Sequence, residues 1–364
     1  MLPKPSLLAS LLISLSLSLP LSRANAASPA AAATPSSAAS SVCNTPEQKI
    51  HEQGFVTLGG IEQWVTVQGE RCANPVILLL HGGPGNPLSP YADTIYGSWA
   101  KSFTLVQWDQ RGAGKTWGRN PAPANSALTL QQMADDGIQL ANYLKLRFGK
   151  QKIIVMGGSW GSILGVQMVK QQPDLFYAWV GVSQYVSYRD NGPASYSKVL
   201  GLARQSDDQK TVAALEAMGP PPWSNPRNFG VLRRAIRSYE AKTTTPPPKD
   251  YWQAAAAYAT PQSLAAYEEG EDYSFLQFIG PKGDGMVSKV DFFAMGPEFK
   301  LPVFMIHGSE DLLTTPEIAK RYFDSIKAPA KEFVLVPRAG HDPNGAMVEA
   351  QYKIMMEKVR PLAQ

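Results

Sequence analysis

The sequence predicts an α/β fold with a mostly parallel central sheet, helices on both faces and an inserted helical cap domain. Three observations predict it. Short apolar runs alternate with helix-like stretches up to residue 182, a Pro-rich block without such runs follows, and apolar runs resume at residue 302. Strands that alternate with helices form parallel sheets covered on both sides. A chain of 364 residues with 44% apolar composition can fill the core of one large α/β domain.

Residues 1–26 have the features of a secretory signal peptide. Lys4 gives a positive start, residues 7–21 form a Leu-rich apolar run, and a small-x-small cleavage motif ends at Ala26. An uncleaved membrane anchor is the alternative, but serines and a proline interrupt the run, which is short for a bilayer span. Residues 27–43 form an Ala/Ser/Pro-rich tether. We expect an exported protein, periplasmic or secreted, with no stable membrane association after cleavage.

The charge pattern and the cysteine count exclude some classes of function. The formal net charge is +4, and beyond the signal peptide no basic tract or acidic tail points to a nucleic acid. Cys43 and Cys72 are too few for a structural zinc site or a disulfide scaffold. In an oxidising compartment they can form one bridge, worth about 3–4 kcal/mol on the chain-entropy model. Two unpaired thiols are the alternative.

The first part of the core is expected at residues 44–187. Residues 55–58 and 61–67 alternate in polarity around Gly59-Gly60, which predicts a two-stranded hairpin. Continuous apolar runs predict strands that are buried on both faces. These runs occupy residues 76–80, 103–108, 153–156 and 178–182, and helices are predicted over residues 128–148 and 162–171.

The helical cap is expected at residues 188–298, and the second part of the core at residues 299–364. Within the cap, Ser206 begins a capping-box pattern ahead of a helix predicted over residues 211–218. Further cap helices are predicted over residues 229–241 and 260–267, and core strands over 302–306 and 333–336. The sheet is therefore expected to resume after the cap.

A candidate nucleophile, Ser159, lies in the sequence Gly157-Gly158-Ser159-Trp160-Gly161. An apolar strand precedes it and a helix follows it. A tight strand-to-helix turn with small residues on both sides places a serine on a strained, exposed apex. The alternative for this common pattern is a Gly-rich structural turn. Ser159 is the nucleophile only if a base and an acid follow it in the right order.

The base is selected by elimination among four histidines. On a sheet of this kind the acid and then the histidine follow the serine, each on a loop after a strand. His51 and His81 precede Ser159, and His307 would precede any acid on the loop that follows it. His341 lies in the loop after the last predicted strand and is the candidate base.

The acid is expected on the loop after the strand at residues 302–306. Glu310 and Asp311 are both available there. The spacing Gly308-x-x-Asp311 carries the chain past the strand end before it presents the carboxylate, so we favour Asp311. The alternative is that Asp311 caps a helix that begins near Thr315.

Two further loops complete the expected site. The Gly-rich loop that His81 opens follows the strand expected to supply an oxyanion donor, so the backbone N–H groups of Gly83 and Trp160 are assigned to the oxyanion hole. His81 is expected to hold this loop. Asp109 and Arg111, after the next strand, are expected to brace the loops as a pair.

The motifs at residues 81–85, 109–114 and 157–162, in this order, resemble the prolyl iminopeptidase family of α/β-hydrolases. The resemblance covers roughly residues 55–182 and 301–364. It implies the α/β-hydrolase fold and a serine peptidase, without cofactor or metal, that releases N-terminal proline from small peptides held under a helical cap.

The cap departs from this family, whose members carry a Trp-and-Glu motif there that binds the substrate's free amino group. Scattered acids offer no clear counterpart, and the Glu268, Glu269 and Glu271 cluster is typical of a solvated face. A carboxylic ester or another small acyl compound is therefore the alternative substrate. An inactive binding protein is disfavoured because no triad member is missing. The cap acids are Glu216, Glu240, Glu268, Glu269 and Glu271.

Overall fold

The computed structural model of the chain describes residues 42–123 and 126–363. The predicted signal peptide, and the predicted tether except for residues 42 and 43, lie outside the described residues. In the part of the chain that is described, no helix is long and apolar enough to cross a membrane.

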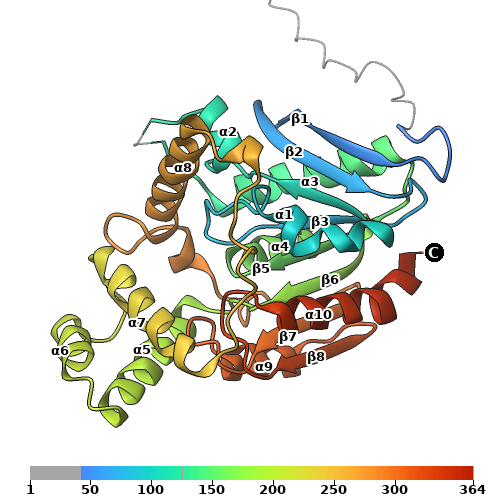
Figure 1. Cartoon of the computed structure of the whole chain (residues 1–364). Helices are drawn as coiled ribbons and strands as arrows, with labels where there is room; N and C mark the ends of the chain where they lie inside the picture. The colour runs from blue at the N-terminus through green and yellow to red at the C-terminus, as the bar shows by residue number, and fades with distance from the viewer. Residues whose placement is uncertain (1–41, 124–125, 364) are drawn as a thin grey trace, which may run out of the picture. The chain divides into compact units, whose positions relative to one another are not determined.

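One sheet organises the described residues, and Figure 1 shows its strands side by side with helices around them. Across residues 42–123 and 126–363 the sheet has eight strands, in the order β1-β2-β4-β3-β5-β6-β7-β8. The pairs β1–β2 and β2–β4 are antiparallel, and every later pair is parallel. The strands are β1 Ile50–Leu58, β2 Ile61–Gly69, β3 Val76–Leu80, β4 Thr104–Trp108, β5 Ile153–Gly158, β6 Phe176–Val182, β7 Val303–Gly308 and β8 Lys331–Val336.

The predicted hairpin is confirmed, with longer strands than the sequence pattern indicated. Leu58 pairs with Ile61 across the turn, where Gly59 and Gly60 have φ values of +54° and +80°. Two positive φ values are typical of the tight turns that match strand twist. A Cβ on Gly59 would lie 1.9 Å from Asp136 Oδ1, so the turn also needs glycine to pack against the neighbouring helix.

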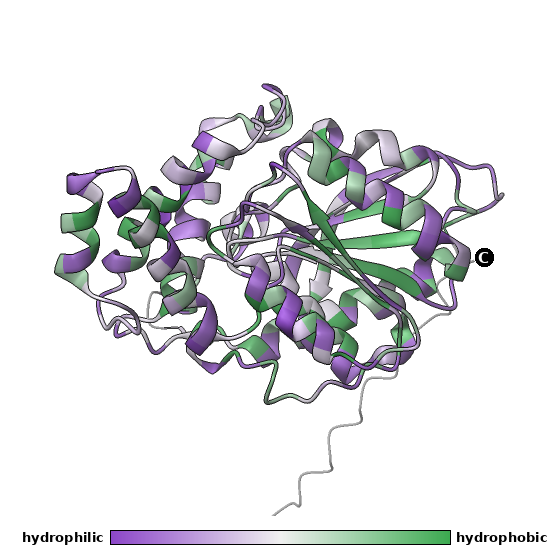
Figure 2. Cartoon of the chain, turned by 90° about the horizontal axis from the view of Figure 1, so that it is seen from below, coloured by the Kyte–Doolittle hydropathy of each residue, from purple (hydrophilic) through white to green (hydrophobic). Residues whose placement is uncertain are grey.

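The predicted central strands are confirmed, because each is buried on both faces of the sheet. Every residue of β3 is at most 2% exposed. Its side chains alternate between two apolar clusters, with Leu78 and Leu80 in one and Ile77 and Leu79 in the other. Figure 2 shows the strands as predominantly apolar, whereas the helices carry polar and apolar sides. The fold class is therefore the one that the sequence predicted.

Helices cover both faces of the sheet. Thr129 caps the start of α3 by accepting a hydrogen bond from the backbone of Gln132, and Gly149 ends this helix in the left-handed conformation. The core helices are α1 Ala92–Tyr96, α2 Gly114–Arg119, α3 Leu130–Phe148, α4 Trp160–Gln171, α9 Pro316–Ser325 and α10 Gly345–Ile354, which continues as a π-helix, Met355–Val359.

The segment between β6 and β7 is helical and has a small apolar core of its own. Its helices are α5 Tyr188–Gln205, α6 Gln209–Met218, α7 Arg227–Thr243 and α8 Pro261–Ile279. Helices α5, α6 and α7 share a buried cluster that includes Val199, Leu215 and Ile236. Leu312, from the loop after β7, packs into the same cluster. This segment is therefore packed onto the loops at one end of the sheet, while the cap boundaries at residues 188 and 298 stay predictions.

The predicted capping box at Ser206 is wrong by two residues. Ser206 ends α5, and Asp208 caps α6 by accepting hydrogen bonds from the backbone N–H and the hydroxyl of Thr211. The error arose because α5 was not predicted, so its end was assigned to the start of α6. The third helix of the cap prediction was also too short, since α8 continues to Ile279.

Cys43 and Cys72 form a disulfide, as predicted for an oxidising compartment. Their Cα atoms lie 5.7 Å apart, and Cys72 is 3% exposed. The bridge joins the start of the described chain to the segment that follows β2.

Candidate active site

Ser159 sits in a strained turn between β5 and α4. Its φ of +54° is unusual for a residue with a side chain, and it precedes the first residue of α4. A Cβ on Gly161 would lie 2.2 Å from the carbonyl oxygen of Leu80, and one on Gly157 would lie 2.4 Å from the carbonyl oxygen of Gly161. The two flanking glycines are therefore required by close backbone approach, which is the geometry of a nucleophile elbow.

The structure brings Ser159, His341 and Asp311 together in one chain of hydrogen bonds. His341 Nε2 lies 2.9 Å from Ser159 Oγ. On the other side of the ring, His341 Nδ1 lies 3.0 Å and 3.2 Å from the two carboxylate oxygens of Asp311. The histidine can therefore take a proton from the serine at Nε2 while Nδ1–H donates to the carboxylate.

Asp311 is fixed by donors from its own loop. Its oxygens accept from the backbone N–H groups of Leu313 and Thr314 and from the Thr314 hydroxyl. His307 Nε2 lies 3.4 Å away. These bonds give Asp311 a turn-forming role as well, but the residue that precedes α9 is Thr315, so the helix-cap alternative is wrong. Glu310, the other candidate acid, instead accepts from the Ser309 hydroxyl.

Asp311 and His341 each stabilise the charged form of the other. Burial raises the pKa of Asp311, but His341 and hydrogen bonds from both neighbouring histidines outweigh it, so the pKa lies well below 3.8. Burial lowers the pKa of His341, but the charge and hydrogen bond of Asp311 outweigh it and raise the pKa above 6.5. An aspartate that stays ionised beside a histidine is what general-base catalysis requires.

Glu240 of α7 also reaches this site, a position that the sequence did not predict for this cap acid. It is 6% exposed, and its two oxygens accept from the backbone N–H groups of Leu312, at 2.8 Å, and His341, at 3.3 Å. Burial and then the charge of Asp311 raise the pKa of Glu240 to about 7. A Cβ on Gly340 would lie 2.8 Å from Glu240, so this glycine makes room for the carboxylate. No local sequence signal separates Glu240 from the other cap acids.

The two residues assigned to the oxyanion hole lie beside Ser159. Trp160 follows it at the N-terminus of α4, where backbone N–H groups have no partner within the helix. Gly83 lines the same cavity as Ser159 and has a φ of +108°. A Cβ on Gly82 would lie 3.5 Å from Ser159 Cβ, so the Gly-rich loop passes directly over the serine.

His81 holds this loop, as expected. Its Nδ1 lies 2.8 Å from the carbonyl oxygen of Gly82, and its Nε2 accepts from the backbone N–H of Gln110. Complete burial lowers the pKa of His81 to about 4. A histidine that stays neutral and bridges two loops has a structural role.

Asp109 and Arg111 brace the loops, but the expectation that they pair with each other is wrong. Arg111 forms an ion pair with the buried Asp136 of α3, at 2.8 Å. Asp109 accepts from Ser89 and from the backbone N–H of Lys115, and burial raises its pKa to about 6. The sequence could not show that a nearer opposite charge, Asp136, would come from a later helix.

Ser159 and His341 open onto a cavity of about 640 Å³. The core of the sheet and its loops line one part of it, and α7, α8 and Trp252 from the segment between them line another. Among them, Arg233, Arg234 and Arg237 come from α7, and Tyr267, Glu271, Phe275 and Phe278 come from α8. The helical segment between β6 and β7 therefore supplies much of the surface that a substrate would contact.

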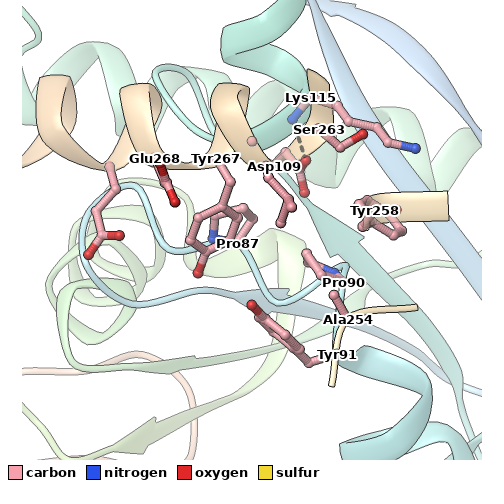
Figure 3. Close-up of a pocket in the computed structure, with 13 residues that line it drawn as sticks. Pro87, Pro90, Tyr91, Asp109, Lys115, Ala254, Tyr258, Ser263, Tyr267 and Glu268 are labelled. Atoms are coloured by element: carbon pink, nitrogen blue, oxygen red, sulfur yellow. Dashed lines mark hydrogen bonds between the residues drawn. The ribbon is translucent and has the colours of Figure 1, made fainter. Parts of the chain in front are cut away.

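A smaller cavity of about 260 Å³ adjoins the first and shares Pro87, Tyr91, Tyr267 and Glu271 with it. Figure 3 shows its acidic and aromatic lining, with Asp109 hydrogen-bonded to the backbone of Lys115. Glu271 thus lines both cavities and is half-buried, so the expected solvated face is wrong for this residue. Glu268 and Glu269 are exposed, as that expectation required. In the described part of the chain, no group of three His, Cys, Asp or Glu residues is placed to hold a metal ion.

Comparison with known proteins finds the same fold and related sequences. Residues 75–344 match the α/β-hydrolase fold family. The chain is 28% identical to a probable aminopeptidase of Bacillus subtilis over 82% of its own length and 93% of the relative. It is 26% identical to a probable proline iminopeptidase of Streptomyces coelicolor over 82% of its length and 92% of that protein. The resemblance that the motifs indicated is confirmed.

A solved structure supports the fold. The proline iminopeptidase of Mycobacterium smegmatis superposes with a TM-score of 0.59 and 22% identity, over 85% of this chain and 97% of that one. At this identity the likeness concerns the arrangement of helices and strands.

Proposed function

The chain belongs to the α/β-hydrolase fold family, and we propose that it is a serine hydrolase that releases N-terminal proline from small peptides. The observation that carries the proposal is the chain of hydrogen bonds from Ser159 through His341 to Asp311, in a cavity that Glu271 also lines. The names of the sequence relatives support the peptidase activity. No cofactor or metal takes part in the proposed reaction.

In the proposed acylation step, Ser159 Oγ attacks the carbonyl carbon of the N-terminal residue. Its proton moves to His341 Nε2, and Asp311 stabilises the imidazolium that forms. The backbone N–H groups of Gly83 and Trp160 hold the oxyanion, with help from the N-terminus of α4. His341 then gives the proton to the leaving amine, the C–N bond breaks, and an ester to Ser159 remains.

Deacylation repeats these roles with water as the nucleophile. His341 Nε2 takes a proton from water, the hydroxide attacks the ester, and the same two N–H groups hold the second oxyanion. Return of the proton to Ser159 Oγ releases the free amino acid. His341 and the N–H groups of Gly83 and Trp160 thus act in both steps, and the protein returns to its starting state.

Glu271 is the carboxylate proposed to bind the substrate's free amino group. Glu271 lies on α8. A Cβ on Gly85 would lie 2.8 Å from the Cα of Glu271, so α8 is packed against the loop that carries Gly83. Glu271 and Gly83 also line the same cavity, which supports this role. Because a buried ammonium needs an opposite charge, an acid in this place favours a substrate with a free N-terminus.

A substrate panel tests the proposal. The mature chain, residues 27–364, is assayed with the para-nitroanilides of proline, alanine, leucine and N-acetylproline, and with para-nitrophenyl acetate. We expect cleavage of the proline anilide above the others, no cleavage of the N-acetylated form, and loss of activity in Ser159→Ala. Ester turnover without cleavage of any anilide would contradict the peptidase activity and would favour a carboxylic-ester hydrolase that uses the same residues.

We propose that the protein is exported and acts in the periplasm or the medium. The features of residues 1–26 favour it, and the Cys43–Cys72 disulfide is typical of an oxidising compartment. Expression of the full chain followed by cell fractionation tests this location. An exported protein should be found in the periplasm or the medium, with a new N-terminus near Ala27. A full-length protein retained in the cytoplasm would contradict it.

A further inference from the structure

Helix α7 turns three arginines toward the cavity that contains Ser159. Counted from Arg233, the other two are Arg234, one residue later, and Arg237, four residues later. At this spacing the three side chains share one side of the helix. All three line the cavity, whereas Leu232 and Ile236 point into the apolar cluster of the helical segment. The side of α7 that faces the cavity is therefore strongly basic.

These arginines have unused hydrogen-bonding capacity. Arg233 Nη2 pairs with Asp342 at 3.1 Å, but its Nη1 is buried with no hydrogen-bond partner within residues 42–123 and 126–363. Over the same residues, Arg234 and Arg237 have neither an ion pair nor a hydrogen bond. By contrast, Arg111 and Arg147 each hold a carboxylate at 2.8 Å or less. A buried guanidinium nitrogen without an acceptor costs stability unless a ligand supplies the acceptor.

The charges around the cavity are arranged unevenly. Two carboxylates, Glu271 and Asp342, face it together with the three arginines, and Asp342 is already paired with Arg233. Figure 1 shows α8 beside α2 and α7 beside α5, in different parts of the helical segment. The acid that is proposed to bind an ammonium and the arginines thus come from different helices around one cavity.

We propose that Arg233, Arg234 and Arg237 form a carboxylate-binding subsite on the leaving-group side of Ser159. Its ligands are short peptides with a free C-terminus, or other acyl substrates whose leaving group carries a carboxylate. The peptide form rests on the function proposed above, because it takes the amino end of the substrate to lie at Glu271. Arginine suits this role because its planar fork can donate two parallel hydrogen bonds to a carboxylate.

A matched pair of substrates isolates the proposed contact. Prolyl-alanine and prolyl-alanine amide differ only in the C-terminal charge. We expect wild-type kcat/KM to favour the free acid by about tenfold, the effect of one good charge-assisted hydrogen bond. High salt is expected to reduce this preference, because the arginines are partly exposed to solvent.

The variants target the two exposed arginines, since Arg233 is paired with Asp342 and acts on the charge of His341. The double variant Arg234→Gln/Arg237→Gln is expected to bring the ratio of kcat/KM for acid over amide close to one. Lysine at both positions is expected to restore part of the preference. Arg227→Gln is the matched control, because Arg227 lies on the same helix and is exposed but does not line the cavity. This variant should keep the wild-type ratio of kcat/KM for acid over amide.

The two proposals fail in different ways. A wild-type ratio near one, or an unchanged ratio in the double glutamine variant, overturns the subsite while leaving the peptidase intact. If no prolyl substrate is cleaved, the peptidase proposal fails, and the subsite is tested with para-acetoxybenzoate against its methyl ester. Preference for the charged ester, lost in the double variant, then supports the subsite, and equal turnover of the two esters overturns it.

Discussion

Glu240, on α7, accepts a hydrogen bond from the backbone N–H of His341, with 3.3 Å between Oε2 and the nitrogen. Its other oxygen holds the N–H of Leu312, the residue after Asp311. One buried carboxylate from the helical segment therefore touches the loops of both the proposed acid and the proposed base. We conclude that the helical segment positions these loops as well as lining the cavity.

Replacement of Glu240 should impair turnover more than substrate binding. In Glu240→Ala two buried N–H groups lose their acceptor, and we expect kcat to fall about tenfold with a smaller change in KM. Above its pKa of about 7 Glu240 carries a negative charge near His341, and Glu240→Gln removes this charge, which should lower the pKa of the histidine. The acid limb of the pH profile should then move to lower pH, which a purely structural role would not cause.

The control for this prediction is Glu216→Gln, because Glu216 is an acid of the same helical segment that pairs with Arg204 at the surface. It should behave as wild type in kcat, KM and pH profile. Wild-type kcat and an unmoved pH profile in both Glu240 variants would contradict the positioning role.

The pH dependence of kcat/KM should follow the ionisation of His341. Because the proposed base must be neutral, and Asp311 raises the pKa of His341 above 6.5, kcat/KM should rise with pH through a midpoint above 6.5. In Asp311→Asn the residual activity should have its midpoint at lower pH, since the charge that favours the imidazolium is gone. Steady-state kinetics across the pH range measure both values, and a wild-type midpoint below 6.5 would argue against this arrangement.

Alanine at Gly161 should disrupt the elbow. Its Cβ would meet the carbonyl oxygen of Leu80 at 2.2 Å, so β3 and α4 would have to separate. We expect a lower melting temperature and loss of activity. Gly201→Ala is the matched control, because Gly201 also lies in a helix and its Cβ would meet nothing within 4 Å. That variant should be as stable as wild type or slightly more stable, by about 0.4–1 kcal/mol.

Loss of the disulfide should reduce stability with little effect on catalysis. The bridge closes a loop with a sequence separation of 29. On the chain-entropy model, Cys43→Ser/Cys72→Ser should lower the free energy of unfolding by about 3–4 kcal/mol. Denaturant titration measures this change, and kcat at a temperature where both proteins are folded should match wild type. Equal stability of the two proteins would show that the bridge contributes nothing.

The sequence predicted the sheet and the proximity of Ser159, His341 and Asp311 because both depend on local patterns and chain order. Buried strands are continuous apolar runs, and Ser159, Asp311 and His341 each follow such a run. It could not identify Glu240 or the basic side of α7, since their roles depend on how α7 packs over the loops after β7 and β8. The partner of Arg111 was missed for the same reason, because Asp136 comes close only when α3 packs against the first hairpin.

The central claim is that Ser159 and His341 act as one unit. The most direct test compares kcat for proline para-nitroanilide in Ser159→Ala, His341→Ala and the double variant. Each single variant should lower kcat by roughly 10⁴- to 10⁶-fold, and the double variant should be no worse than the more damaging single one. Wild-type turnover by Ser159→Ala, or losses that multiply in the double variant, would contradict the claim.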